Sequence, residues 1–123
     1  MQGAIPAISL VSQSGFLSAF ANDSAPDLAY AQETYAYAAD KDVFIGISTS
    51  GNAKNVNYAA MVAKEKGALV ISLTGETGGD LKEMSDILFN VPAKETYLVQ
   101  EYHLPVYHLL CRLVEYEMFG EEL

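Results

Sequence analysis

A cluster of hydroxyl and amide side chains lies where an apolar run changes into a helical pattern, in the segment FIGISTSGNAKNV at residues 44–56. The members of this cluster are Ser48, Thr49, Ser50 and Asn52. The first N–H groups of a helix lack partners and carry positive partial charge, so an anion such as a phosphate can bind there. Gly51 would let the backbone come close to it. Helix capping is the alternative interpretation, but a cap needs one such residue rather than four.

His108 is the second residue whose chemistry stands out, because an imidazole with a pKa near ~6.5 can accept or donate a proton at neutral pH. A hydrogen-bonded structural histidine is the alternative, and position alone favours it. Gln100 could orient a ligand hydroxyl or be an exposed helix residue. Asp23, in the stretch ANDSAPD, could contact a ligand or take part in helix capping. His103 is five residues from His108 and so on a different helical face, which predicts a structural or interfacial role.

Short apolar runs rich in Ile and Val predict the strands that must position these groups. The runs are residues 5–11, 43–48, 68–73 and 87–91. They lack two-residue alternation, which is typical of a parallel sheet covered on both faces. Helical patterns alternate with them, so the fold class is predicted to be α/β, with a doubly wound and mainly parallel sheet. The cluster at 48–52 then lies at the carboxyl end of a strand, where open α/β sheets bind ligands.

Four helical patterns accompany these strands. The first is predicted to begin near Ser24 and Pro26, the second to end at Gly67, the third to be short (81–85), and the last to run from about 97 to 119. Apolar residues at helical spacing predict the inner face of three of these helices. In the first helix they are Leu28, Ala31, Tyr35 and Ala38, and in the second they are Val56, Ala59, Ala60 and Ala63. In the last helix they are Val99, Tyr102, Val106, Leu109, Leu110 and Leu113. Pro105 is predicted to kink the last helix.

Composition limits the class of protein. A chain of 123 residues with 50% hydrophobic residues and a net charge of −9 predicts one globular domain (1–123) that binds neither nucleic acid nor anionic membranes. The apolar runs are shorter than the roughly 18 residues of a membrane span. No Lys or Arg precedes Lys41, so a signal peptide is not expected and a cytoplasmic location is. Cys111, the single cysteine, is predicted to lie in the core.

Three segments, the first of which contains the 48–52 cluster, resemble a known family. GISTSGNAKNV, ALVISLTGETGGDLKEMSDILFNVP and VQEYHLPVYHLL are similar to the sugar isomerase (SIS) domain, and within it to the phosphoheptose isomerases. AISLVSQSGFLSAFANDSAPD resembles the segment that precedes the loop in that family. The resemblance implies a flavodoxin-like three-layer sandwich, a homo-oligomer (dimer or tetramer), and conversion of sedoheptulose 7-phosphate into a heptose 7-phosphate in carbohydrate metabolism.

The resemblance also implies roles for individual residues. Ser48, Thr49, Ser50 and Asn52 would bind the phosphate of the substrate, Asp23 and Gln100 would contact the sugar, and His108 would be the catalytic histidine. No cofactor would be required, although some members bind zinc through the positions of Gln100 and His108 together with residues of an earlier helix.

This chain departs from the family pattern in two places. Ala53 stands where the family loop usually has another serine. The family's first βα unit, with a glycine-rich loop and a helix that bears a catalytic glutamate, has no counterpart in the sequence, so the chain is expected to be an N-terminally shortened member. A non-catalytic SIS module that binds a sugar phosphate or a protein is therefore the alternative function, and this chain alone is expected to be inactive.

Overall fold

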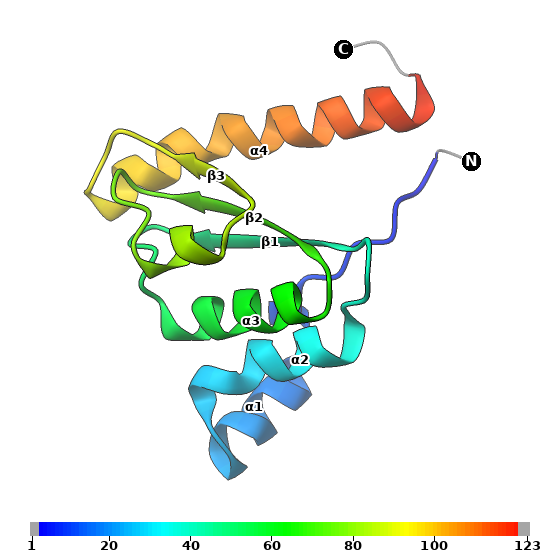
Figure 1. Ribbon diagram of the computed structural model, residues 1–123, viewed down its shortest axis with the longest axis vertical. Helices are drawn as coiled ribbons and strands as arrows, with labels where there is room; N and C mark the ends of the chain where they lie inside the picture. Colours follow the sequence, from blue (N-terminus) through cyan, green and yellow to red (C-terminus); the bar gives the residue numbers. More distant parts are fainter. Residues whose placement is uncertain (1–2, 121–123) are drawn as a thin grey trace.

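Three parallel strands form the centre of the protein, seen in a computed structural model that describes residues 3–120 (Figure 1). They are β1 (Val43–Ser48), β2 (Leu69–Thr74) and β3 (Ile87–Asn90), in the spatial order β1-β2-β3. Val43 is paired with Leu69, and Ile71 with Ile87, so all three strands end at the same edge of the sheet. The predicted strands 43–48, 68–73 and 87–91 are confirmed to within one residue at each end.

Helix α3 (Lys54–Glu65) connects β1 to β2 and covers one face of the sheet. Its predicted apolar stripe is confirmed, because Ala59, Ala60 and Ala63 are fully buried. Two of these alanines form the main core with Val70 of β2 and with Leu81, which lies in the 3-10 helix Asp80–Met84. Small side chains at these positions let the helix approach the sheet closely.

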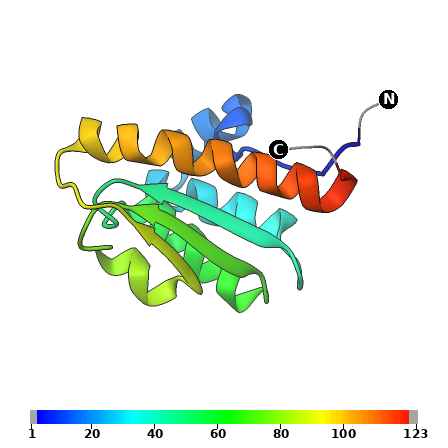
Figure 2. The ribbon, with the colours of Figure 1, turned by 90° about the horizontal axis from the view of Figure 1, so that it is seen from above.

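Helix α4 (Thr96–Phe119) lies across the opposite face, which gives the predicted three-layer α/β sandwich (Figures 1 and 2). Val99 of its first turns is buried with Val91 and Ala93. The helix continues through Pro105, and its later turns extend beyond the sheet.

The predicted inner face of this last helix is therefore only partly right. Val106 and Leu110 are half-buried, whereas Tyr102, Leu109 and Leu113 are exposed. The prediction of a core position for Cys111 is wrong, since its thiol is exposed. Helical spacing places these residues on one face, but burial also requires a second surface, and within residues 3–120 no element covers that part of α4.

The N-terminal region differs most from prediction. Residues 5–11 form no strand: most of the segment is irregular, the 3-10 helix Leu10–Ser12 follows, and Ile5, Ile8 and Val11 are 41–61% exposed. An apolar run becomes a strand only when an adjacent strand supplies hydrogen bonds, and none of the described strands pairs with this one.

Helices α1 (Ser14–Asp23) and α2 (Ala29–Tyr37), joined through the 3-10 helix Pro26–Leu28, form a further layer against α3 (Figure 1). The predicted face of α2 is only partly right, since Ala31 is buried and Ala38 is half-buried. Leu28 and Tyr35 are exposed, while Glu33 and Thr34 are buried. None of the helices between residues 3 and 120 is both long enough and apolar enough to cross a membrane.

Candidate functional site

The loop after β1, residues 48–52, closes on itself through its own side chains. The N–H of Gly51 donates to the carbonyl oxygen of Ser48 and also to its Oγ, both at 3.1 Å. The N–H of Asn52 donates to Oγ of Ser50 at 3.1 Å. Gly51 adopts φ +70°, a left-handed conformation that favours glycine. The loop is thus a tight turn in which the hydroxyls hold the backbone.

A second loop, residues 75–79, lies against the first at the carboxyl end of β2. The N–H of Gly75 donates to the carbonyl oxygen of Thr49 at 2.9 Å. Just past this loop, the N–H of Asp80 donates to Oδ1 of Asn52 at 3.0 Å and the N–H of Leu81 to the carbonyl oxygen of Gly51 at 3.0 Å. The two carboxyl-terminal loops therefore form one unit.

Glycine is required where these loops touch. A Cβ atom at Gly51 would collide with the carbonyl oxygen of Gly78, and one at Gly79 would lie 2.5 Å from the carbonyl oxygen of Ser50. The prediction from sequence included Gly51 but missed the part that residues 75–79 play. The run GETGGD directly after a strand was the available signal.

The start of α3 beside these loops has no side-chain cap. Ala53 occupies the N-cap position and makes no side-chain capping hydrogen bond. In the first turn, the N–H of Val56 donates to Oδ1 of Asn55 at 2.9 Å, so the side chains at 48–52 do not cap this helix. Capping therefore does not account for the cluster of hydroxyls. Ser48 is buried, Thr49 is half-buried, and Ser50 and Asn52 are exposed. An uncapped helix N-terminus next to accessible hydroxyl and amide groups has the donors that a phosphate needs.

His103 links α4 to this edge of the sheet. Its ring is 2% exposed, and its Nε2 lies 3.0 Å from the carbonyl oxygen of Thr74, the last residue of β2. A carbonyl only accepts, so Nε2 is the donor of this hydrogen bond. The predicted structural role of His103 is confirmed. By fixing the first half of α4 against β2, His103 also sets the position of Gln100 and His108.

Gln100 and His108 are both exposed on α4, two turns of helix apart. The ring of His108 lies edge-on to that of Tyr107, with centroids 5.0 Å apart. Asp23 is exposed at the end of α1 and accepts a hydrogen bond of 2.7 Å from Nδ2 of Asn22. Because α1 and α4 lie on opposite sides of the sheet, residues 3–120 do not bring Asp23 and His108 together in one copy of the chain (Figure 1).

The described residues do not fit a zinc ion. Zinc takes about four ligands, and Gln100 and His108 supply two donors. No group of three or more His, Cys, Asp or Glu side chains occurs in the part of the chain that the structure covers. By themselves, Gln100 and His108 can form hydrogen bonds, and His108 can also transfer a proton.

Comparison with known proteins gives a consistent result. The SIS domain pattern matches residues 16–111. The chain is 41% identical over 116 residues to the phosphoheptose isomerase of Citrifermentans bemidjiense, a match that covers 94% of this chain and 60% of that protein.

Two solved structures are also similar. One is the phosphoheptose isomerase of Neisseria gonorrhoeae, with a TM-score of 0.84 and 36% identity, covering 87% of this chain and 61% of that one. The other is a phosphoheptose isomerase of Francisella tularensis, with a TM-score of 0.87 and 30% identity, covering 91% and 62%. The chain thus spans about three fifths of the length of the relatives that it matches.

Proposed function

Because the chain belongs to the SIS domain family, we propose that it is part of a sugar-phosphate isomerase, with sedoheptulose 7-phosphate as the substrate. The observation that carries this proposal is the 48–52 loop, held by the 75–79 loop beside the uncapped start of α3. Such a loop can bind the phosphate end of a sugar with neutral donors. It can therefore bind an anion even though the chain has a net charge of −9.

Each member of the loop has its own part in this proposal. The N–H groups of Gly51 and Asn52 are already used inside the loop, so the phosphate takes its hydrogen bonds from the hydroxyls of Ser48, Thr49 and Ser50, the Asn52 amide, and the first turn of α3. These groups position the substrate before reaction, which lowers the entropic part of the barrier.

The proposed reaction moves a proton between neighbouring carbons. A base removes the proton from the carbon next to the carbonyl while the carbonyl oxygen gains a proton, which gives an enediol. A proton then returns to the former carbonyl carbon, and the hydroxyl on the neighbouring carbon loses its proton to become the new carbonyl. His108 is the proposed group for one of these transfers, because an exposed imidazole exchanges protons readily at neutral pH. Gln100 and Asp23 are proposed to orient sugar hydroxyls. Asp23 would have to come from a second copy of the chain, since α1 and α4 lie on opposite sides of the sheet.

Assembly from several copies agrees with the exposed apolar surface. Val43, Ile45 and Ile47 of β1 are 51–55% exposed, and among the described strands β1 pairs on one side only. Unpaired strand edges and apolar faces favour association. We therefore propose a homo-oligomer.

A non-catalytic sugar-phosphate-binding module is the second candidate. It is favoured by the single imidazole exposed on α4, since isomerisation needs a second acid–base group. The family resemblance places that group in a helix outside this sequence. A coupled assay separates the candidates: turnover of about 1 s⁻¹ or more by this chain alone would refute the binding module.

The phosphate assignment is tested by calorimetry with sedoheptulose 7-phosphate and with sedoheptulose. Charge-assisted hydrogen bonds contribute about 1.5–3 kcal/mol each, so Ser50→Ala should weaken binding of the phosphate about tenfold or more. Ser18→Ala, an exposed change on α1, is the matched control and should have no effect. Equal affinity for the sugar with and without its phosphate would refute the assignment.

A further inference from the structure

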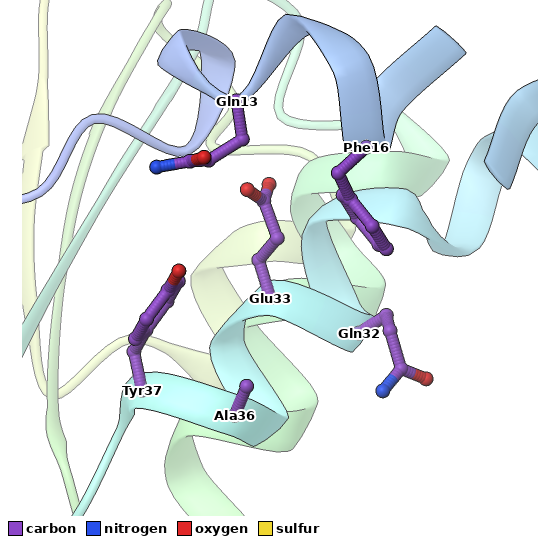
Figure 3. A pocket seen from close by; sticks show the side chains of 6 residues that line it. All are labelled: Gln13, Phe16, Gln32, Glu33, Ala36 and Tyr37. Carbon is purple, nitrogen blue, oxygen red and sulfur yellow. The ribbon is translucent and has the colours of Figure 1, made fainter. Parts of the chain in front are cut away.

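A pocket of about 210 Å³ lies between the start of α1 and helix α2 (Figure 3). Helix α2 packs on the side of α3 that is turned away from the sheet (Figure 1). It is lined by Gln13, Phe16, Gln32, Glu33, Ala36 and Tyr37. None of these residues belongs to the loops at the carboxyl edge of the sheet, so the pocket is a separate feature of the molecule.

The carboxylate of Glu33 points into this pocket (Figure 3). The residue is 4% exposed, and both Oε1 and Oε2 are buried without a hydrogen-bond partner in the part of the chain that is described. The ion pairs found there involve other carboxylates. Burial also raises the pKa of Glu33. A buried carboxylate without a partner is costly, so this one is poised to accept a cationic donor.

We propose that the pocket binds a guanidinium group through Glu33. Both carboxylate oxygens are free, and a guanidinium can donate two parallel N–H···O bonds to them, whereas an ammonium is a point charge without this fork. The rings of Phe16 and Tyr37 flank the carboxylate, and a planar, weakly hydrated cation is suited to aromatic neighbours (Figure 3).

A metal ion fits this pocket poorly, because one carboxylate and two glutamine amides offer few oxygen ligands for a hard cation. The guanidinium could belong to a small guanidino compound or to an arginine side chain of a polypeptide. Both sources share the chemistry that Glu33 would recognise.

The test is an NMR titration of the full chain with methylguanidinium chloride at constant ionic strength. Saturable shifts are expected in the backbone amides of residues 13–16 and 32–37. Glu33→Gln should weaken the binding at least fivefold, and Glu101→Gln, an exposed change on α4, should not alter it. Urea, which is planar and neutral, should cause no saturable shift.

N-Acetylarginine amide distinguishes the two sources. Binding as tight as that of methylguanidinium supports a polypeptide side chain, and much weaker binding supports a small molecule. If Glu33→Gln perturbs the fold, Phe16→Leu retains the carboxylate and should weaken binding at least twofold. Equal titration of the wild type and Glu33→Gln, saturable binding of urea, or shifts that never saturate would overturn the proposal.

Discussion

Replacement of Gly51 by alanine tests whether the two carboxyl-terminal loops form one unit. The substitution adds a single methyl group, which would collide with the carbonyl oxygen of Gly78. It also forces an alanine to adopt φ +70°. The 75–79 loop would have to move, and the hydrogen bonds that join Thr49 to Gly75 and Asn52 to Asp80 would lengthen or break.

The loss of stability expected for Gly51→Ala has two parts. A left-handed conformation costs a residue with a Cβ atom roughly 1–2 kcal/mol. Overpacking against a well-fitted backbone adds about 1–3 kcal/mol. Gly51→Ala should therefore lower the free energy of unfolding by about 2–5 kcal/mol. Gly120 separates the two parts, because it has φ +68° but, among residues 3–120, no atom lies within 4 Å of the Cβ position. Gly120→Ala should cost only the first part.

Urea unfolding of the two variants and the wild type measures these costs, and calorimetry measures binding of the sugar phosphate. Gly51→Ala should be about 1–3 kcal/mol less stable than Gly120→Ala. It should also bind sedoheptulose 7-phosphate at least about tenfold more weakly, since one lost charge-assisted hydrogen bond has that effect. If the two variants lose the same stability and bind equally well, the packing of the two loops does not hold the site.

Three further predictions concern single side chains. Burial raises the pKa of Glu33, so the folded state binds a proton at this carboxylate more tightly than the unfolded state does. The ionised carboxylate therefore lowers the free energy of unfolding at pH values above its ordinary pKa of 4.5. In urea unfolding, Glu33→Gln should therefore have a higher free energy of unfolding than the wild type at pH 7 and an unchanged one at pH 3, and a gain at both would contradict this cause. In thermal unfolding, His103→Leu should lower the free energy of unfolding by about 0.5–1.5 kcal/mol, the contribution of one hydrogen bond, because the carbonyl oxygen of Thr74 still accepts from the N–H of Val91 at 3.0 Å. A loss above about 4 kcal/mol would show that the ring contributes more than this hydrogen bond. In a full-length protein of this family that contains this sequence, His108→Asn should lower kcat about 10²–10⁴-fold with KM little changed, and near-normal kcat would return His108 to a structural role.

Local patterns predicted the central elements well. The strand 43–48 and the alanine stripe of α3 agree with the structure, because β1 is rich in β-branched residues and α3 buries one regular face. Because the bounds of β1 were predicted correctly, the cluster at 48–52 was also placed correctly at the carboxyl end of a strand. The absence of a cap at Ala53 could not be predicted, since four possible capping residues precede it and three of them, Ser48, Ser50 and Asn52, use their side chains in other hydrogen bonds.

Where prediction failed, strand pairing or burial depended on a segment that is distant in the sequence. Residues 5–11 have strand composition, but none of the described strands pairs with them, and within residues 3–120 most apolar side chains of the later turns of α4 stay exposed. Glu33 is buried although its charge would place it on the surface, because the segment with Gln13 and Phe16 packs over that side of α2. Local spacing carries no information about these long-range contacts.

The sequence by itself determined the alternation of strand and helix, the parallel sheet and the chemical character of the 48–52 loop. Each of these depends on side-chain type and on spacing over a few residues. Only the tertiary structure decided that the 75–79 loop holds this loop, that His103 joins α4 to β2, and that the carboxylate of Glu33 is buried without a partner. These contacts join segments brought together by the packing of the layers, and their geometry exists only once the sheet and its helices have assembled.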